Sequence, residues 1–392
     1  MKLVMKIPLS YNLRHLVVRR TTSLMTALGI ALTVGVLLAV LALVDGLRQA
    51  FAATGDPLHV LVLRKGSDSE LVSNLSRAVY QDMRSNPGIS RGPSGEPRIS
   101  LELVTIVNLP RIDNPDGMNV TLRGLAPLGL KMREGLTLTA GRWFDPGKRE
   151  VVVGSSISKR FPDAALGRRI HLGRADWDIV GIMETRNSVS NSEIFADLNL
   201  LAADNNRSEV LSSALVEAPD EASVVVLLED LNNDRRLNVN AQRERDYYGA
   251  QTSSGAPIQY IGTLVALIMA VGSSFAAMNT MYAAVARRSR EIGTLRVLGF
   301  SRGSILASFL IEAALLSLVG GLIGLVLVLP LNGVTTGIGN FNTFSEISFN
   351  FHIGPAAALK GLVFAVTIGV VGGLLPAIMA SRKEILTALR EI

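Results

Sequence analysis

Four long apolar segments constrain the fold of this chain more than any other feature of its 392 residues. The first, Leu24 to Val44, has 21 residues and no charged side chain. At ~1.5 Å per residue, a helix of this length measures ~31 Å, enough to cross the hydrocarbon core of a bilayer. The other three segments are 258–286, 303–331 and 361–380. We therefore expect four transmembrane helices.

A secretory signal peptide is the alternative for the first segment, because basic residues precede it. Signal peptides have an apolar region of only ~7–15 residues, and Val44-Asp45-Gly46 is a poor small-residue cleavage site. A retained helix is the better interpretation. The second segment has 29 residues without a charge. It corresponds to ~43 Å of helix, so it must tilt or project beyond the ~30 Å core.

The net charge of +6 is concentrated beside these segments. Residues 1–20 carry +5, residues 286–304 carry +4 and residues 381–392 carry +1, so the rest of the chain carries −4. Short basic segments beside membrane spans stay in the cytoplasm, which places both termini and the 286–304 connection inside. Residues 49–255 and 332–357 then lie outside. A nucleic-acid-binding protein would instead carry a basic face on a folded domain, so nucleic acid is excluded as a partner.

The segment 49–255 mixes strand and helix patterns and has no cysteine to form a disulfide. Short apolar or alternating runs bounded by turn residues predict strands at 58–63, 100–109, 118–123, 150–153, 168–172 and 177–182. Helices are expected at 68–83 and 223–231, and a helical stalk at 243–254. The predicted fold class is an α-helical membrane protein with four transmembrane helices and a large mixed α/β extracytoplasmic domain inserted between helices 1 and 2.

These patterns divide the chain into nine segments. They are a cytoplasmic amphipathic segment (1–20), transmembrane helix 1 (21–48), an outer α/β domain of one or two lobes (49–255), transmembrane helix 2 (256–286), a cytoplasmic coupling loop or helix (287–303), transmembrane helix 3 (304–331), a short outer loop (332–357), transmembrane helix 4 (358–381) and a cytoplasmic tail (382–392). Residues 8–20 alternate apolar and basic side chains. One interpretation is that these residues act only as a topology signal. The other is that they also form a helix that lies on the inner face of the membrane.

The sequence contains no convincing catalytic, metal-binding or cofactor-binding motif. Gly141 to Arg149 (GRWFDPGKR) has one residue too many between its glycines for a phosphate-binding loop. Arg149 also stands where such a loop needs Ser or Thr for Mg²⁺. The four histidines are isolated. We therefore expect a chain that is not an enzyme and binds no cofactor, and that depends on a partner for any ATP hydrolysis.

Three residues of the third span are unusual. Glu312 is a carboxylate within an apolar segment, at a cost of ~2.5–3.5 kcal/mol if it lay at mid-bilayer. It is either a proton or substrate site or a structural partner for a cytoplasmic-side arginine or a neighbouring helix end. We favour the structural role, because no second acid lies in any span. Gly320 and Gly324 form a small-xxx-small pair, which predicts close packing within the bundle rather than a dimer face.

The connection between the second and third spans is the strongest functional candidate. Residues Ala286 to Ile305 read ARRSREIGTLRVLGFSRGSI, with five arginines and one acid, Glu291. The interior of this connection, Ile292 to Phe300, is compact and partly apolar. If the connection served only to keep this side of the protein in the cytoplasm, its arginines would suffice and the apolar residues would not be needed. We therefore predict that a cytoplasmic partner binds this connection.

Several segments resemble the MacB/FtsX family of ABC transporter permeases. Met278-Asn279-Thr280-Met281, followed by ARRSREIGTLRVLGFSRGSILASFLIEA, is similar to that family's signature, and GLLPA with SRKEILTALREI is similar to its C-terminal end. The opening NLRHLVVRR and first span, and REGLTLTAGRWFD with REVVVGSSISKRF in the outer segment, are similar as well. One span, a large outer domain and three further spans form the layout of that family.

The resemblance implies a permease subunit that forms a dimer, with a homodimer favoured over a heterodimer. The dimer would assemble with two copies of a separate ATPase that binds ATP and Mg²⁺. The segment 290–301 would be the coupling helix that docks into the ATPase. There, arginines would make charge contacts, apolar residues would fill the cleft and glycines would permit close approach. The residues of this predicted coupling site are Arg290, Glu291, Ile292, Gly293, Leu295, Arg296, Val297, Leu298, Gly299 and Arg302.

In permeases of this kind, ATP-driven shifts of the spans move the outer domain, which is called mechanotransmission. The chain is thus expected in the bacterial inner membrane, in contact with lipids, where it drives efflux or extraction of a substrate. A periplasmic adaptor and an outer-membrane channel would be further partners in efflux. One alternative is a regulator that transmits ATPase motion to a cell-wall hydrolase, and another is a sensor without an ATPase. The chain begins close to the membrane, which predicts that no ATPase domain is fused to it.

Overall fold

The computed structural model describes residues 20–111, 114–133, 135–185, 188–340 and 343–383. The expected N-terminal amphipathic segment and most of the expected C-terminal tail lie outside these residues. The chain forms two compact units. The helical unit comprises the residues up to Asp45, residues 257–334 and those from Phe351 onward. The α/β unit comprises residues 46–256 and 335–350.

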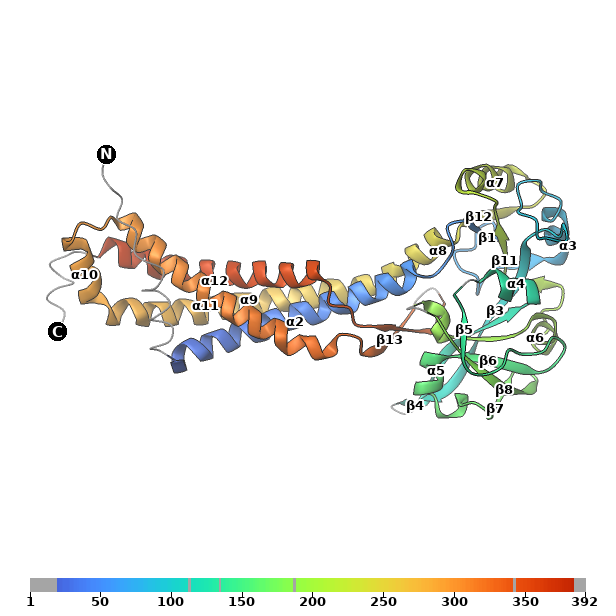
Figure 1. Ribbon diagram of the computed structural model, residues 1–392, viewed down its shortest axis with the longest axis horizontal. Helices are drawn as coiled ribbons and strands as arrows, with labels where there is room; N and C mark the ends of the chain where they lie inside the picture. Colours follow the sequence, from blue (N-terminus) through green and yellow to red (C-terminus); the bar gives the residue numbers. More distant parts are fainter. Residues whose placement is uncertain (1–19, 112–113, 134, 186–187, 341–342, 384–392) are drawn as a thin grey trace. The chain divides into compact units, whose positions relative to one another are not determined.

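The described part of the helical unit is built from four long helices and one short one (Figure 1). The long helices are α2 (Arg20–Ala52), α9 (Ala256–Arg287), α11 (Arg302–Val328) and α12 (Pro355–Arg382), and the short one is α10 (Ser289–Val297). A 3₁₀ turn, η4 (Leu329–Leu331), follows α11. Each long helix has the length and apolar composition needed to cross a membrane. The four predicted membrane helices are therefore confirmed.

Small residues bring the long helices close together, as is common in membrane bundles. A Cβ atom at Gly320 would lie 2.7 Å from a backbone carbonyl oxygen of α2, and one at Gly324 would lie 2.6 Å from another. Thr33 of α2 also shares a hydrogen bond of 2.6 Å with Ser273 of α9. The glycine pair thus packs α11 against α2 of the same chain.

The described residues of the α/β unit form one mixed sheet of ten strands, in the order β12-β1-β11-β3-β4-β9-β6-β8-β5, with β7 paired to β8 (Figure 1). The strands are β1 (His59–Arg64), β3 (Ile99–Arg111), β4 (Asn114–Leu125), β5 (Thr137–Gly141), β6 (Glu150–Gly154), β7 (Arg169–Leu172), β8 (Ala175–Glu184), β9 (Glu193–Asp197), β11 (Ser213–Glu217) and β12 (Val239–Arg243). The β4–β9 and β6–β8 pairs are parallel, whereas the other pairs are antiparallel. The predicted mixed α/β domain is confirmed.

Short helices cover this sheet. They are α3 (Arg77–Met83), α4 (Pro127–Met132), α5 (Ser155–Arg160), α6 (Leu198–Asp204), α7 (Glu221–Asn233) and α8 (Glu244–Gln251), with the 3₁₀ turns η1 (Pro162–Ala164), η2 (Val189–Ser192) and η3 (Thr252–Gly255). A two-stranded ladder joins β2 (Leu75–Ser76) to β10 (Val210–Leu211). The helix expected at 68–83 begins only at Arg77, because Ser76 caps it by accepting from the N–H of Val79 over 3.3 Å.

A β-hairpin stands where a short outer loop was expected. β13 (Thr335–Gly339) pairs antiparallel with β14 (Glu346–Asn350). The hairpin belongs to the α/β unit, although the chain on its two sides leads into α11 and α12. Glu346 is buried and forms ion pairs with Arg111 of β3, over 2.8 Å, and with Arg160 of α5. These pairs hold the connection between two membrane helices on the α/β unit.

Replacing Glu346 by alanine is expected to destabilise the α/β unit, because Arg111 and Arg160 both lose their carboxylate partner. The two arginine side chains are 18% and 19% exposed, so solvent compensates part of the loss. We expect the free energy of unfolding to fall by about 2 kcal/mol. Both tryptophans of the chain lie in this unit, so tryptophan fluorescence during urea unfolding of the full chain measures it.

Thr335→Ala on the same hairpin is the matched control. Thr335 is exposed, and among the described residues its hydroxyl bonds only to the side chain of Asn350, over 2.8 Å. It should change the free energy of unfolding by less than about 0.5 kcal/mol. Equal effects of the two substitutions would contradict the role assigned to the Glu346 ion pairs.

Candidate functional site

The candidate coupling segment folds as helix α10 and a tight turn. Gly299 ends the helix, because its φ of +96° is a left-handed conformation that glycine adopts without strain. Its N–H donates to the carbonyl of Arg296 over 3.2 Å. Ser301 then begins α11 as its N-cap, with its Oγ accepting from the N–H of Ser304 over 3.1 Å. These two signals turn the chain from α10 directly into α11.

One side of α10 packs into the helical unit. Ile292 is 2% exposed and lies in an apolar cluster with side chains of α9, α11 and α12. Gly293 is buried, and Leu295 and Arg296 are half-buried. The expectation that Ile292 fills the cleft of a partner needs correction, because its own chain already encloses its side chain. Ile292 instead holds α10 on the membrane helices.

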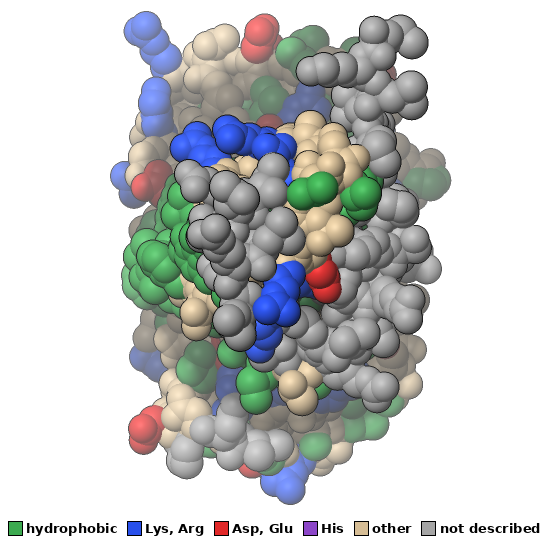
Figure 2. Space-filling view, turned by 90° about the vertical axis from the view of Figure 1, so that its left-hand side faces the viewer, with side chains coloured by type: hydrophobic (Ala, Val, Ile, Leu, Met, Phe, Trp, Pro, Cys, Tyr) green, Lys and Arg blue, Asp and Glu red, His purple; other side chains and the backbone are tan. Residues whose placement is uncertain are grey.

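The other side of α10 is open and combines charge with apolar surface. Arg290, Thr294, Val297 and Leu298 follow the i, i+4, i+7, i+8 spacing of one helix face, and all four are exposed. We call these four residues the α10 face. Val297 and Leu298 are each 63% exposed. Figure 2 looks onto this end of the helical unit and shows arginine and lysine side chains, in blue, near apolar ones, in green. The other predicted coupling residues that are exposed are Glu291, Gly299 and Arg302.

Glu312 of α11 pairs with Arg288, the residue that precedes α10. Arg288 Nη1 donates to Glu312 Oε2 over 2.7 Å and Nη2 donates to Oε1 over 3.1 Å. Both side chains are only 6% exposed, and the guanidinium lies 5.9 Å from the centre of the Phe309 ring. A bidentate pair satisfies a buried carboxylate, which favours a structural role over a proton or substrate site. The pair also fixes the start of α10 to α11.

A buried charge network in the α/β unit was not expected from the sequence. Arg123 of β4 is 2% exposed and donates to Glu70, Glu102 and Glu193 over 2.7–3.1 Å. It also donates to the hydroxyl of Tyr248 of α8 over 3.3 Å. Burial raises the pKa of Glu70, but the charge of Arg123, together with the hydrogen bonds from Arg123 and Ser213, outweighs burial and lowers that pKa overall. The network joins the sheet to α8, the helix that precedes α9.

His59 of β1 makes a second contact between the sheet and α8. Its Nδ1 lies 2.9 Å from Glu244 Oε2, and both side chains are 6% exposed. Burial lowers the pKa of His59, but the hydrogen bond and the charge of Glu244 outweigh burial and raise the pKa above its ordinary 6.5. Burial likewise raises the pKa of Glu244, but the hydrogen bond from His59 helps to lower it overall. The two groups therefore favour the charged pair.

The α/β unit is expected to lose stability as the pH rises through the pKa of His59. A histidine whose pKa is raised on folding contributes fully below an unfolded-state pKa of about 6.5, and this contribution disappears above the folded-state pKa. Glu244, with its lowered pKa, acts in the opposite direction and loses its contribution on acidification. Thermal unfolding of the full chain, followed by tryptophan fluorescence from about pH 6 to about pH 9, should show a falling midpoint. His59→Gln should flatten this fall, and identical slopes would contradict the assignment.

Within the described residues, no group of three or more His, Asp or Glu side chains is arranged to hold a metal ion. The acids of the buried network are instead bonded to arginine, as in the Arg123 contacts and in the pair of Arg133 with Glu102. The geometry is that of ion pairs that join strands and helices.

Two family descriptions match the two parts of the chain. The MacB-like periplasmic core domain matches residues 23–233, more than half of the chain. The FtsX-like permease C-terminal domain matches residues 263–385, which include α10. The chain belongs to the MacB/FtsX-like family of ABC transporter permeases. This confirms the resemblance found in the sequence, and the α/β unit is accordingly the extracytoplasmic domain of a multi-pass membrane protein.

Some relatives of this permease have about its own length, and others are much longer. YknZ of Bacillus subtilis (strain 168), an uncharacterized ABC transporter permease, is 26% identical over 96% of this chain and 97% of its own length. MacB of Rhodopseudomonas palustris (strain BisB18), a macrolide export ATP-binding/permease protein, is 28% identical over 65% of this chain. The permease spans only 41% of that relative and 58% of the MacB of Wolinella succinogenes.

Two solved structures are also similar to parts of the permease. The extracellular domain of YknZ from Gram-positive bacteria has a TM-score of 0.36 and 14% identity, and the match covers 47% of this chain and 100% of that domain. The periplasmic region of MacB from Actinobacillus actinomycetemcomitans has a TM-score of 0.36 and 13% identity, over 48% of this chain and 90% of that region.

Proposed function

We propose that this chain is the permease subunit of an ABC transporter and that a separate ATPase subunit docks on the α10 face. The observation that carries the proposal is the exposure of Val297 and Leu298 beside Arg290, at the turn between two membrane helices. Large apolar side chains that are exposed together are candidates for the centre of an interface. The surrounding arginines would attract an acidic partner surface and orient it.

The contacts of α10 support a mechanical role for this surface. Ile292 anchors α10 in the apolar cluster, and the Arg288–Glu312 pair fixes its start to α11. A partner that moves α10 therefore moves α9 and α11 with it. α9 continues from α8, which the buried network holds on the sheet, and α11 leads into the hairpin that Glu346 holds. Motion at the α10 face thus has two covalent routes to the extracytoplasmic domain.

The proposed assembly contains two copies of this chain and two ATPase subunits, with ATP and Mg²⁺ bound by the ATPase. The chain lies in the bacterial inner membrane with both termini in the cytoplasm. ATP-driven movement of the extracytoplasmic domain drives efflux or extraction of a substrate, with a periplasmic adaptor and an outer-membrane channel as partners in efflux. The export function in the name of the MacB relatives supports efflux. The alternative is a regulator that transmits ATPase motion to a cell-wall hydrolase.

Affinity purification of the full chain from its native membranes tests the proposal. We expect a co-purifying protein with a phosphate-binding loop, in a one-to-one ratio, and ATP hydrolysis by the purified complex. Recovery of an adaptor supports efflux, and recovery of a cell-wall hydrolase supports the regulatory alternative. A homogeneous, folded chain recovered without an ATPase under several detergents would contradict the proposal.

A further inference from the structure

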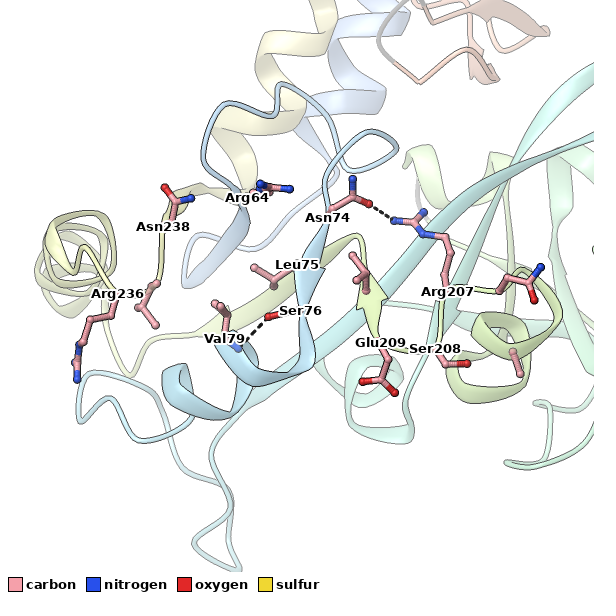
Figure 3. A pocket seen from close by; sticks show the side chains of 14 residues that line it. Arg64, Asn74, Leu75, Ser76, Val79, Arg207, Ser208, Glu209, Arg236 and Asn238 are labelled. Carbon is pink, nitrogen blue, oxygen red and sulfur yellow. Dashed lines mark hydrogen bonds between the residues drawn. The ribbon is translucent and has the colours of Figure 1, made fainter.

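A pocket of about 960 Å³ lies in the extracytoplasmic domain, and its lining includes no member of the buried charge network (Figure 3). It is lined by β2, β10, the N-terminal part of α3 and the segments before β10 and β12. Its volume is within the range of pockets that hold small molecules. Leu75, Val79 and Leu237 give it an apolar wall, and Leu75 and Leu237 are buried while they line it.

The polar part of this pocket is rich in arginine. Arg64 and Arg207 line it without a carboxylate within ion-pair distance among the described residues, and Glu209 is the only acid in the lining. Arg207 is half-buried and donates only to neutral oxygens, those of Ser73, Asn74 and Val104, over 3.1–3.4 Å. Burial without a compensating acid lowers the pKa of Arg207. An approaching anion therefore stabilises the charged form of this partly buried guanidinium.

A further arginine adds to the positive charge next to the pocket. Arg77 donates to the carbonyl oxygen of Ser208, over 2.7 Å, and to the side chain of Asn199, so its contacts are neutral as well. Arg236 differs from the other arginines. It lines the pocket, but it is 87% exposed and forms an ion pair with Asp234 over 2.7 Å. In Figure 3 the Arg207 side chain turns toward Asn74, whereas Arg236 lies at the opposite side of the pocket.

The backbone of the pocket is also unusual. Three described non-glycine residues have a positive φ, and two of them, Asn206 at 56° and Asn238 at 51°, line this pocket. Asparagine tolerates the left-handed region better than most residues, but two such positions at one pocket hold both lining loops in unusual conformations. Asn206 directly precedes Arg207, so this conformation sets where the guanidinium points.

We infer that this pocket binds a small amphipathic anion, with a carboxylate or phosphate group at Arg64 and Arg207 and a short apolar part against Leu75, Val79 and Leu237. The basis is the juxtaposition of unpaired arginines with an apolar wall in one pocket of the extracytoplasmic domain. The inference does not depend on the ATPase. The pocket can therefore prove empty while the ATPase still docks on the α10 face, or it can bind an anion although no ATPase docks there.

Ligand-detected NMR and calorimetry on the full chain in nanodiscs test this site with three probes: hexanoate, its neutral analogue hexanamide, and inorganic phosphate. We expect hexanoate to bind about tenfold more tightly than hexanamide, because the charge-assisted hydrogen bonds to arginine are lost with the amide. Hexanoate should also bind more tightly than phosphate, which lacks an apolar part. Equal binding of hexanamide would contradict the anionic part of the proposal, and tighter binding of phosphate would contradict the amphipathic part.

Four substitutions assign the binding to this pocket. Because Arg64 is exposed, Arg64→Gln should weaken hexanoate binding about tenfold without unfolding the domain. Arg207→Gln should weaken it as well, although its contacts to Ser73 and Val104 also support the fold. Glu209→Gln removes the repelling acid and should tighten binding about threefold. Arg169→Gln is the matched control: Arg169 is an exposed arginine of β7 that lies outside the pocket lining, so this change should leave binding unaltered. Unaltered affinity in both Arg64→Gln and Glu209→Gln would overturn the site.

Discussion

Replacing Val297 and Leu298 together by aspartate is expected to abolish capture of the ATPase while the chain still folds and inserts. Both side chains are 63% exposed, so the helical unit loses no core packing. In the complex, however, each aspartate would place a charge in a desolvated contact. Central interface residues contribute about 2 kcal/mol or more each, so the pair should weaken docking by more than about a hundredfold. Quantitative pull-down with a purified ATPase measures this loss.

The matched control is Val225→Asp with Val226→Asp on α7. These two valines are 48% and 58% exposed and belong to the extracytoplasmic domain. The change in chemistry is the same, but no ATPase can reach the site if the topology is right. Full capture is expected for this control. Full capture by the Val297/Leu298 variant, or an equal loss in both variants, would contradict docking at the α10 face.

Breaking the Arg288–Glu312 pair is expected to have the second large effect. Arg288→Met leaves a carboxylate that is 6% exposed without its partner, and Glu312→Met leaves a guanidinium in the same state. The loss of one member of a buried ion pair costs about 3–5 kcal/mol of unfolding free energy. Each single variant should therefore unfold at a much lower temperature in detergent and accumulate poorly in membranes.

The double variant Arg288→Met with Glu312→Met distinguishes a structural pair from a functional acid. Apolar side chains of similar length often replace a buried ion pair with little loss of stability. We expect the double variant to recover most of the thermal stability and the stimulation of the ATPase. A stable double variant that binds the ATPase but has lost all transport would show that Glu312 acts as a proton or substrate site instead.

The membrane helices could be predicted because long segments without charge leave a signal that does not depend on tertiary contacts. Strands such as β3 and β4 were predicted from their alternation. β9 (EIFAD) is buried along its whole length and β11 (SALVE) along nearly all of it, so they show no alternation. Their Glu and Ser residues also interrupt an apolar run. The β13–β14 hairpin was missed because its anchor, Glu346, pairs with an arginine 235 residues away in the sequence.

The candidate site was predictable in place but not in detail. The spacing of apolar residues between the arginines indicated a helix for a partner, and the structure places α10 there. The sequence could not tell that Ile292 faces inward while Val297 faces outward, since that depends on how α10 lies on three other helices. Nor could it select Arg288 from five arginines as the partner of Glu312. The Arg123 network was missed because its acids, Glu70, Glu102 and Glu193, lie 53, 21 and 70 residues away from Arg123 in the sequence.

Cysteine labelling tests most directly whether the α10 face is on the cytoplasmic side, where an ATPase can reach it. The chain has no cysteine of its own, so Thr294→Cys on the α10 face and Val226→Cys on α7 each provide a single label site. With a membrane-impermeant maleimide on intact cells, position 226 should react, and position 294 should react only after the inner membrane is permeabilised. Labelling of position 294 in intact cells would place α10 outside and contradict the coupling of this permease to a cytoplasmic ATPase.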